Sequence, residues 1–143
     1  MKYFKNLDAG WVDIEIENFK GHVSNMLNVP WNVLRAYEEY IIYGHCIIPF
    51  DEEGSDFNIY IDDVSVIILK YKDDYEIFEV GTNPSMFIKD IALDIANNLK
   101  EWVKWYNAND NINDGLDFKQ LELICIKLGL LKTKIINFMG RGV

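Results

Sequence analysis

Between His45 and Gly81 the chain carries four short segments with the patterns of strands, and their close spacing restricts the fold more than any other feature. FNIYIDD and YEIFEVG alternate apolar and polar residues, whereas CIIPF and VSVIILKY are nearly continuous apolar runs. Only short polar loops, such as DEEGSD and KDD, separate them. Connections this short join antiparallel neighbours, so we predict a four-stranded antiparallel meander. Because Pro49 cannot donate a ladder hydrogen bond, the first strand should end there or lie at an edge.

The residues before this meander have the pattern of a helix. Pro30 suits a first helical turn, and Gly44 suits the position that ends a helix. Between them, apolar and aromatic residues recur at helical spacing: Leu34, Tyr37 and Ile41. We therefore predict a helix over residues 30–43, with a short helical turn over 23–27 before it. Further upstream, the alternation in WVDIEIE predicts a half-buried strand over residues 11–17.

A longer helix is predicted directly after the meander. Thr82 or Asn83 can act as its cap, and Pro84 suits its first turn. The helical pattern continues to residue 106 with apolar residues along one face: Ile88, Ile91, Ile95, Leu99, Trp102 and Tyr106.

From about residue 107 the chain has the character of a helical addition. Its first part, NANDNINDG, has the composition of a loop. The stretch from Asp110 to Gly115 imitates part of a calcium loop, but Ile112 and Leu121 stand where oxygen ligands are needed. The residues from Asp117 to Gln120 resemble a capping box and predict the start of a last helix. The tail over residues 133–143 could add an edge strand or a docked end.

Together these patterns predict one α+β domain over residues 1–143, in which an antiparallel sheet of about four to six strands is flanked by helices. Half of the 143 residues are apolar, which is enough to bury a sizeable core without disulfides or metal. Cys46 and Cys125 both lie in apolar runs, so we expect two buried thiols. No apolar run approaches the length of a membrane span and no leader is evident, so we expect a cytoplasmic protein.

The charge of the chain is strongly negative and unevenly distributed. The formal net charge is −9. Residues 119–143 carry five cations and one acid, which leaves nine cations and 22 carboxylates, a charge of −13, on the other 118 residues. Phosphate would be repelled by such a surface, so direct binding of nucleic acid is disfavoured and a basic protein is the more natural partner. No membrane partner is expected.

The acids are densest in HCIIPFDEEGSDFNIYIDD, which holds six carboxylates and no cation. A calcium loop is disfavoured because Gly54 is fourth rather than sixth in the loop, and the twelfth position is Asp62 rather than glutamate. We predict instead that the acids contact a basic protein partner, with two aromatic residues of the preceding helix as anchors. The predicted partner-binding residues are Asp51, Glu52, Glu53, Asp56, Asp62, Asp63, Trp31 and Tyr43.

The sequence contains no recognisable catalytic motif. No serine lies in a GxSxG context, and the two histidines, His22 and His45, lack the close spacing of metal ligands. We expect a non-enzymatic binding domain without cofactor or metal. Two alternatives stay open: a structural or regulatory adaptor whose acids serve solubility, and a small metal-dependent hydrolase using His45 with Asp51, Glu53 or Asp56.

The order of these segments resembles the SMI1/KNR4 (SUKH) superfamily over about residues 25–95. VPWNVLRAYEEYIIYG provides a proline-started aromatic helix ending in a glycine turn, and IIPFDEEGSDFNIYID provides an apolar-Pro-Phe strand, an acidic glycine loop and an alternating strand. The residues that carry the resemblance are Pro30, Tyr37, Tyr40, Gly44, Pro49, Phe50, Asp51, Gly54 and Asn58. The resemblance implies an α+β immunity protein that neutralises a cognate toxin in a contact-dependent or polymorphic toxin system of bacteria. The clustered acidic surface would suit a toxin that is a basic nuclease.

Overall fold

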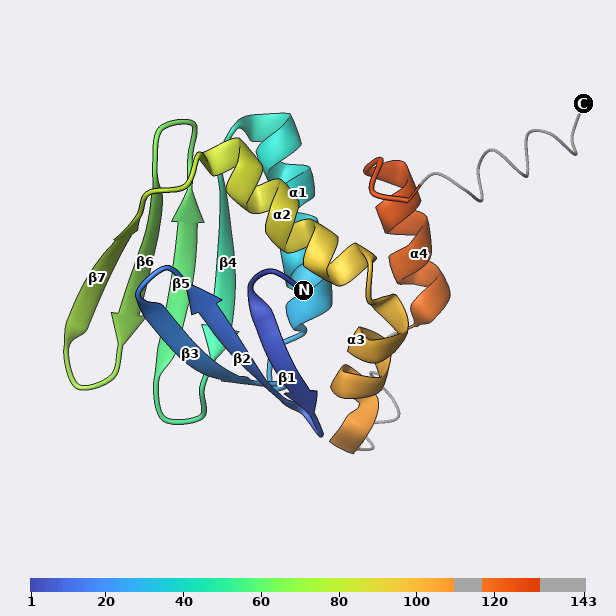
Figure 1. Ribbon diagram of the computed structural model, residues 1–143, viewed down its shortest axis with the longest axis horizontal. Coiled ribbons are helices and arrows are strands. Elements are labelled where there is room, and N and C mark those ends of the chain that lie inside the picture. The colour runs from blue at the N-terminus through green and yellow to red at the C-terminus, as the bar shows by residue number, and fades with distance from the viewer. Residues whose placement is uncertain (110–116, 132–143) are drawn as a thin grey trace, which may run out of the picture.

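The computed structural model describes residues 1–109 and 117–131 of the chain, which form strands in two groups and helices packed against them (Figure 1). In chain order the elements are β1 (Phe4–Asp8), β2 (Trp11–Ile16), β3 (Phe19–Ser24), α1 (Val29–Tyr43), β4 (Cys46–Asp51), β5 (Asp56–Ile61), β6 (Val66–Tyr71), β7 (Tyr75–Val80), α2 (Pro84–Ala96), α3 (Leu99–Tyr106), the 3-10 helix η1 (Asn107–Asn109) and α4 (Phe118–Lys127).

The α+β class and the four-stranded antiparallel meander are confirmed. The sheet has the order β4-β5-β6-β7, with each strand antiparallel to the next. Strand β4 lies at an edge, as Pro49 predicted, and continues past the proline to Asp51. The helix predicted over residues 30–43 is α1, in which the Asn28 side chain accepts a hydrogen bond from the Trp31 N–H at 3.1 Å. At its other end Gly44 takes a left-handed conformation.

A second sheet of three antiparallel strands, in the order β1-β2-β3, was only partly predicted. The strand expected over residues 11–17 is β2, but the helical turn expected over 23–27 is wrong, because Val23 and Ser24 belong to β3. At Gly21 in β3, an added Cβ would lie 2.9 Å from side-chain atoms of Ile14 and Phe57. The glycine therefore allows the close approach of the two sheets and weakens the strand signal in the sequence.

The helix expected over residues 83–106 is interrupted between α2 and α3. The backbone carbonyl of Asp94 accepts hydrogen bonds from the Asn98 side chain at 3.0 Å and from the Trp102 indole nitrogen at 3.1 Å. These two side chains reach back to the last turn of α2 from beyond the break. Asparagine favours such local bonds over continued helix, which explains the break at Asn97 and Asn98.

The last described helix, α4, begins as predicted after Asp117. The Asp117 carboxylate accepts a hydrogen bond from the Lys119 N–H at 2.9 Å, one position before the Gln120 expected for a capping box. The calcium-like stretch from Asp110 to Gly115 and the tail over 133–143 lie outside the described residues.

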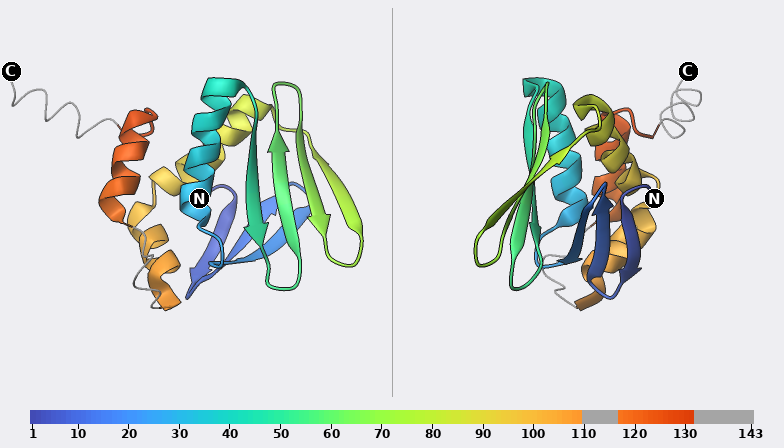
Figure 2. Two further views of the ribbon diagram at one scale, coloured as in Figure 1. Left: turned by 180° about the vertical axis from the view of Figure 1, so that it is seen from behind. Right: turned by 60° about the vertical axis from the view of Figure 1, so that its left-hand side comes forward.

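The core lies between the four-stranded sheet on one side and the helices and three-stranded sheet on the other (Figure 2). Its centre is aromatic: the ring of Phe57 lies 4.8 Å from the rings of both Phe19 and Phe50, centroid to centroid. Burial raises the pKa of the Cys46 thiol to about 12 and that of Cys125 to about 11.

Within the described part of the chain, no helix combines the length and the apolar character needed to cross a membrane.

The amino terminus is held by one buried carboxylate. Asp94, only 5% exposed, accepts hydrogen bonds from the backbone N–H groups of Lys2 and Tyr3 at 2.7 Å and of Phe4 at 3.3 Å. Replacing a buried charged acceptor leaves its donors unsatisfied, and that costs more than the loss of an exposed ion pair.

We expect Asp94→Asn to lower the free energy of unfolding by about 2–4 kcal/mol, because the amide NH₂ group would face backbone donors. The matched control is Asp90→Asn, which removes the partly exposed ion pair of Asp90 with Lys2 at 2.8 Å and should cost less than about 1 kcal/mol. Urea denaturation of both variants measures the difference. Equal losses would show that the Asp94 carboxylate does not anchor the amino terminus.

Candidate protein-binding surface

The eight predicted partner-binding residues do not lie in one cluster. Strands β4 and β5 are antiparallel, so the hairpin of residues 51–56 lies at one end of the sheet and the turn of residues 62–65 lies at the other end (Figure 1). The six residues of β5 span roughly 17 Å between these ends. Trp31 and Tyr43 are separated in the same way, since they occupy the first and last turns of α1.

The Glu52 carboxylate is held within the chain. It accepts hydrogen bonds from the His22 N–H at 3.0 Å and the Ser55 hydroxyl at 2.9 Å, and it lies 3.1 Å from the Lys70 ammonium. Its side chain is only 10% exposed. Glu52 therefore joins the hairpin to β3 and β6, and it offers little surface to a partner.

Two other predicted acids form the turns themselves. The Asp51 carboxylate accepts a hydrogen bond from the Glu53 N–H at 2.6 Å. The Asp62 carboxylate accepts hydrogen bonds from the N–H groups of Val64 at 2.9 Å and Ser65 at 2.7 Å, and from the Ser65 hydroxyl at 3.0 Å. These bonds stabilise the charged form and lower the pKa of Asp62.

The remaining predicted acids, Glu53, Asp56 and Asp63, are exposed. Sequence reasoning missed Asp73 and Asp74, two further exposed acids in the turn between β6 and β7. This turn lies at the same end of the sheet as the β4–β5 hairpin (Figure 1). That end consequently gathers exposed carboxylates from the β4–β5 and β6–β7 hairpins.

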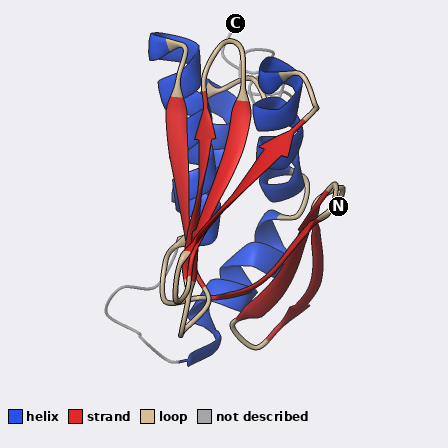
Figure 3. Cartoon of the chain, turned by 90° about the vertical axis from the view of Figure 1, so that its left-hand side faces the viewer, coloured by secondary structure: helices blue, strands red, loops and turns tan. Residues whose placement is uncertain are grey.

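The largest unexpected feature is the face of the four-stranded sheet that points away from the core. The helices and the three-stranded sheet lie on the opposite side of this sheet (Figures 2 and 3). Strand register and alternation assign twelve side chains to this outer face: Ile47, Pro49, Asp51, Asp56, Asn58, Tyr60, Ile67, Leu69, Tyr71, Tyr75, Ile77 and Glu79.

The outer face is mainly apolar and contains no cation. Eight of its twelve residues are aliphatic, aromatic or proline, and three of the others are acids. Several of the apolar side chains are well exposed, among them Ile47 at 51%, Tyr75 at 64% and Ile77 at 67%. The continuous apolar runs CIIPF and VSVIILKY could have predicted this apolar outer face. A strand with apolar residues at successive positions presents them on both faces of the sheet.

The two histidines occupy separate places. The His22 Nδ1 atom lies 2.7 Å from the Asp13 carboxylate, the Trp11 ring stacks on the imidazole at 4.6 Å, and the Asn6 amide donates to the same carboxylate at 2.9 Å. The hydrogen bonds from Asn6 and His22 lower the pKa of Asp13. His45 lies beside Tyr43 at the opposite end of β4 from Asp51.

These positions do not bring together the residues that the hydrolase alternative would need for a metal site. His45 is separated by the length of β4 or β5 from Asp51, Glu53 and Asp56. Among residues 1–109 and 117–131, no group of three or more His, Cys, Asp or Glu side chains could hold a metal ion.

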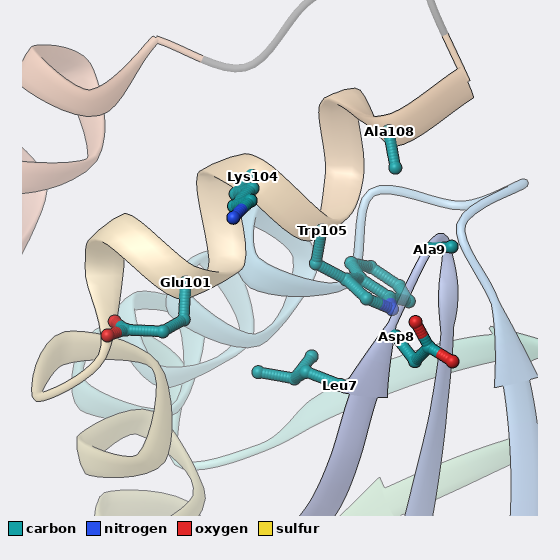
Figure 4. A pocket seen from close by; sticks show the side chains of 7 residues that line it. All are labelled: Leu7, Asp8, Ala9, Glu101, Lys104, Trp105 and Ala108. Atoms are coloured by element: carbon teal, nitrogen blue, oxygen red, sulfur yellow. The ribbon is translucent and has the colours of Figure 1, made fainter.

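A separate pocket of about 480 Å³ lies between the end of β1 and α3 (Figure 4). It is lined by small and apolar side chains and by charges of both signs: Leu7, Asp8, Ala9, Glu101, Lys104, Trp105 and Ala108. The indole N–H of Trp105 is buried there without a hydrogen-bond partner.

Comparison of the chain with protein-family models, curated proteins and solved structures finds no match. The resemblance to the SMI1/KNR4 superfamily therefore stays a prediction. The functional proposal rests instead on the outer face of the four-stranded sheet.

A pair of matched substitutions tests whether the outer face is dispensable for folding. We expect Ile77→Thr to change the free energy of unfolding by less than about 1 kcal/mol, because this exposed side chain does not touch the core. Ile68→Thr, on the neighbouring strand but fully buried, should cost about 2–4 kcal/mol through a cavity and a buried hydroxyl. Urea denaturation gives both values. A loss at Ile77 as large as that at Ile68 would show that the outer face is packed in the folded chain.

Proposed function

We propose that this chain is a non-enzymatic protein-binding domain whose partner presents a basic rim around an apolar patch. We further propose that it is an immunity protein, acting in the cytoplasm to neutralise a cognate bacterial toxin such as a basic nuclease. The observation that carries the proposal is the outer face, which combines exposed apolar side chains with acids and lacks cations.

The apolar part of the outer face supports binding to a protein. Contiguous exposed apolar surface is uncommon on monomeric proteins and often marks an interaction site. Tyrosines such as Tyr60, Tyr71 and Tyr75 are residue types that often dominate binding energy when a partner buries them. The strands beneath these side chains are paired on a rigid sheet, so little order has to be gained on binding.

The acids support a basic partner. Asp51, Asp56 and Glu79 lie on the outer face itself, and Asp73 and Asp74 extend the negative charge along one end of the sheet. Complementary charge speeds association and rejects acidic partners. A toxin that acts on nucleic acid commonly carries a cationic active site, and an acidic surface is suited to cover it.

The proposal is tested with proteins encoded beside the gene for this chain. The carboxy-terminal domain of a neighbouring secreted protein is expressed in a bacterial host with and without this chain, and growth is measured. We expect this chain to restore growth.

Variants of this chain then assign the rescue to the outer face. Ile77→Asp should abolish rescue and weaken the purified complex by about tenfold to a hundredfold, because it puts a charge into the apolar surface that the partner would bury. The control is Leu123→Asp on α4, since Leu123 is 65% exposed and lies off the sheet. Full rescue by Ile77→Asp would remove the outer face from the interface, and a lack of any toxic neighbour would favour the adaptor alternative.

A further inference from the structure

The two edges of the four-stranded sheet are built differently. Strand β4 contains Pro49 and packs against α1, and both features hinder the addition of another strand. Strand β7 contains no proline, pairs with β6 without a bulge, and has no buried residue. Among the described residues, no strand lies on its outer side (Figures 1 and 3). The β7 edge therefore keeps a row of backbone groups available for pairing.

The side chains of β7 indicate what could pair with this edge. Every second residue of an edge strand directs its N–H and C=O groups away from the sheet. Glu79 and Ile77 lie on the outer face, while Glu76 and Phe78 alternate with them on the other face. The strand thus offers one acid and two apolar or aromatic residues on each face, and no cation.

A second copy of this chain is a poor occupant of the edge. Pairing two β7 strands would bring four glutamates together at one seam, between two chains that each carry a net charge of −9. Like charges on neighbouring strands are destabilising, and acids at an edge oppose self-pairing. The same acids favour a strand that carries lysine or arginine.

We propose that β7 accepts an extended basic segment of the partner as a fifth strand of the sheet, with cations beside Glu76 and Glu79 and apolar residues beside Ile77 and Phe78. This inference rests on the proposed function, because it specifies how the same basic partner attaches. Backbone hydrogen bonds hold the added strand, and side-chain pairs select it. The added strand would continue the outer face and enlarge the apolar surface that is buried.

The experiment uses a labelled synthetic peptide with the order Thr-Lys-Val-Val-Arg-Thr. In antiparallel pairing, its cations face Glu79 and Glu76, and its valines face Phe78 and Ile77. Fluorescence anisotropy measures binding to the whole chain, and hydrogen exchange measures the protection of the amides over residues 75–80. We expect binding with new protection at β7, and a loss of about tenfold or more when glutamate replaces both cations of the peptide.

Backbone methylation separates strand pairing from charge attraction. Adjacent residues of a strand direct their N–H groups to opposite sides, so only one of the two valine N–H groups would face β7. Methylating that nitrogen should abolish binding, whereas methylating the other valine should have a much smaller effect. Equal binding by both methylated peptides would overturn the proposal, as would binding without protection of the β7 amides or no binding at all.

Matched charge variants of the chain complete the test. Glu76→Lys with Glu79→Lys should weaken binding of the basic peptide by about tenfold or more. The control, Asp8→Lys with Glu101→Lys, makes the same change in net charge at exposed positions on β1 and α3 and should have little effect. If the two double variants weakened peptide binding equally, the peptide would be attracted by the net charge of the whole molecule and not by β7.

The outcomes also separate this inference from the proposed function. Growth rescue that depends on Ile77, together with failure of the peptide, would retain the binding role and reject strand addition. Peptide pairing without any rescue would retain strand addition and reject the toxin. Protection of β7 that rises with the concentration of the free chain would identify a second copy as the occupant and overturn the proposal.

Discussion

The carboxylate and carbonyl of Asp94 join the first residues of the chain to the segment between α2 and α3. Its carboxylate receives the N–H groups of Lys2, Tyr3 and Phe4 where β1 begins, and its carbonyl receives the side chains of Asn98 and Trp102 where α3 begins. Buried polar groups need partners, so these bonds set the position of β1 against both helices. The three-stranded sheet is thereby fixed on the same side of the four-stranded sheet as α2 and α3.

The hydrophobic periodicity of the sequence correctly predicted the elements that depend mainly on local contacts. The β4–β7 meander and α1 have clear periods and turn signals at both ends, and the structure contains them. The elements that were missed depend on distant partners. Strand β3 contains Gly21 because Phe57 approaches from the other sheet, and α2 ends where Trp102 and Asn98 bind the Asp94 carbonyl. No single window of sequence reveals such contacts, because they form only in the tertiary structure.

The candidate site was predictable in composition and not in geometry. Counting acids drew attention to the stretch of residues 45–63, but the register of β4 with β5 places its carboxylates at opposite ends of the sheet. Hydrogen bonds and ion pairs then distinguish acids that look alike in the sequence. Glu52 is held by His22, Ser55 and Lys70, whereas its neighbour Glu53 is exposed. The apolar character of the outer face followed from runs of successive apolar residues, a signal that an emphasis on charge obscured.

The alternation of β4 to β7 places the side chains that support the fold and those that meet the solvent on opposite faces of one backbone. Phe57 and Ile59 belong to the core, while Asn58 and Tyr60 between them point outward. A lineage could therefore diversify the outward positions one at a time, because each change is largely uncoupled from the packing behind it. The sheet would then serve as a constant scaffold on which specificity for new binding partners can be exchanged.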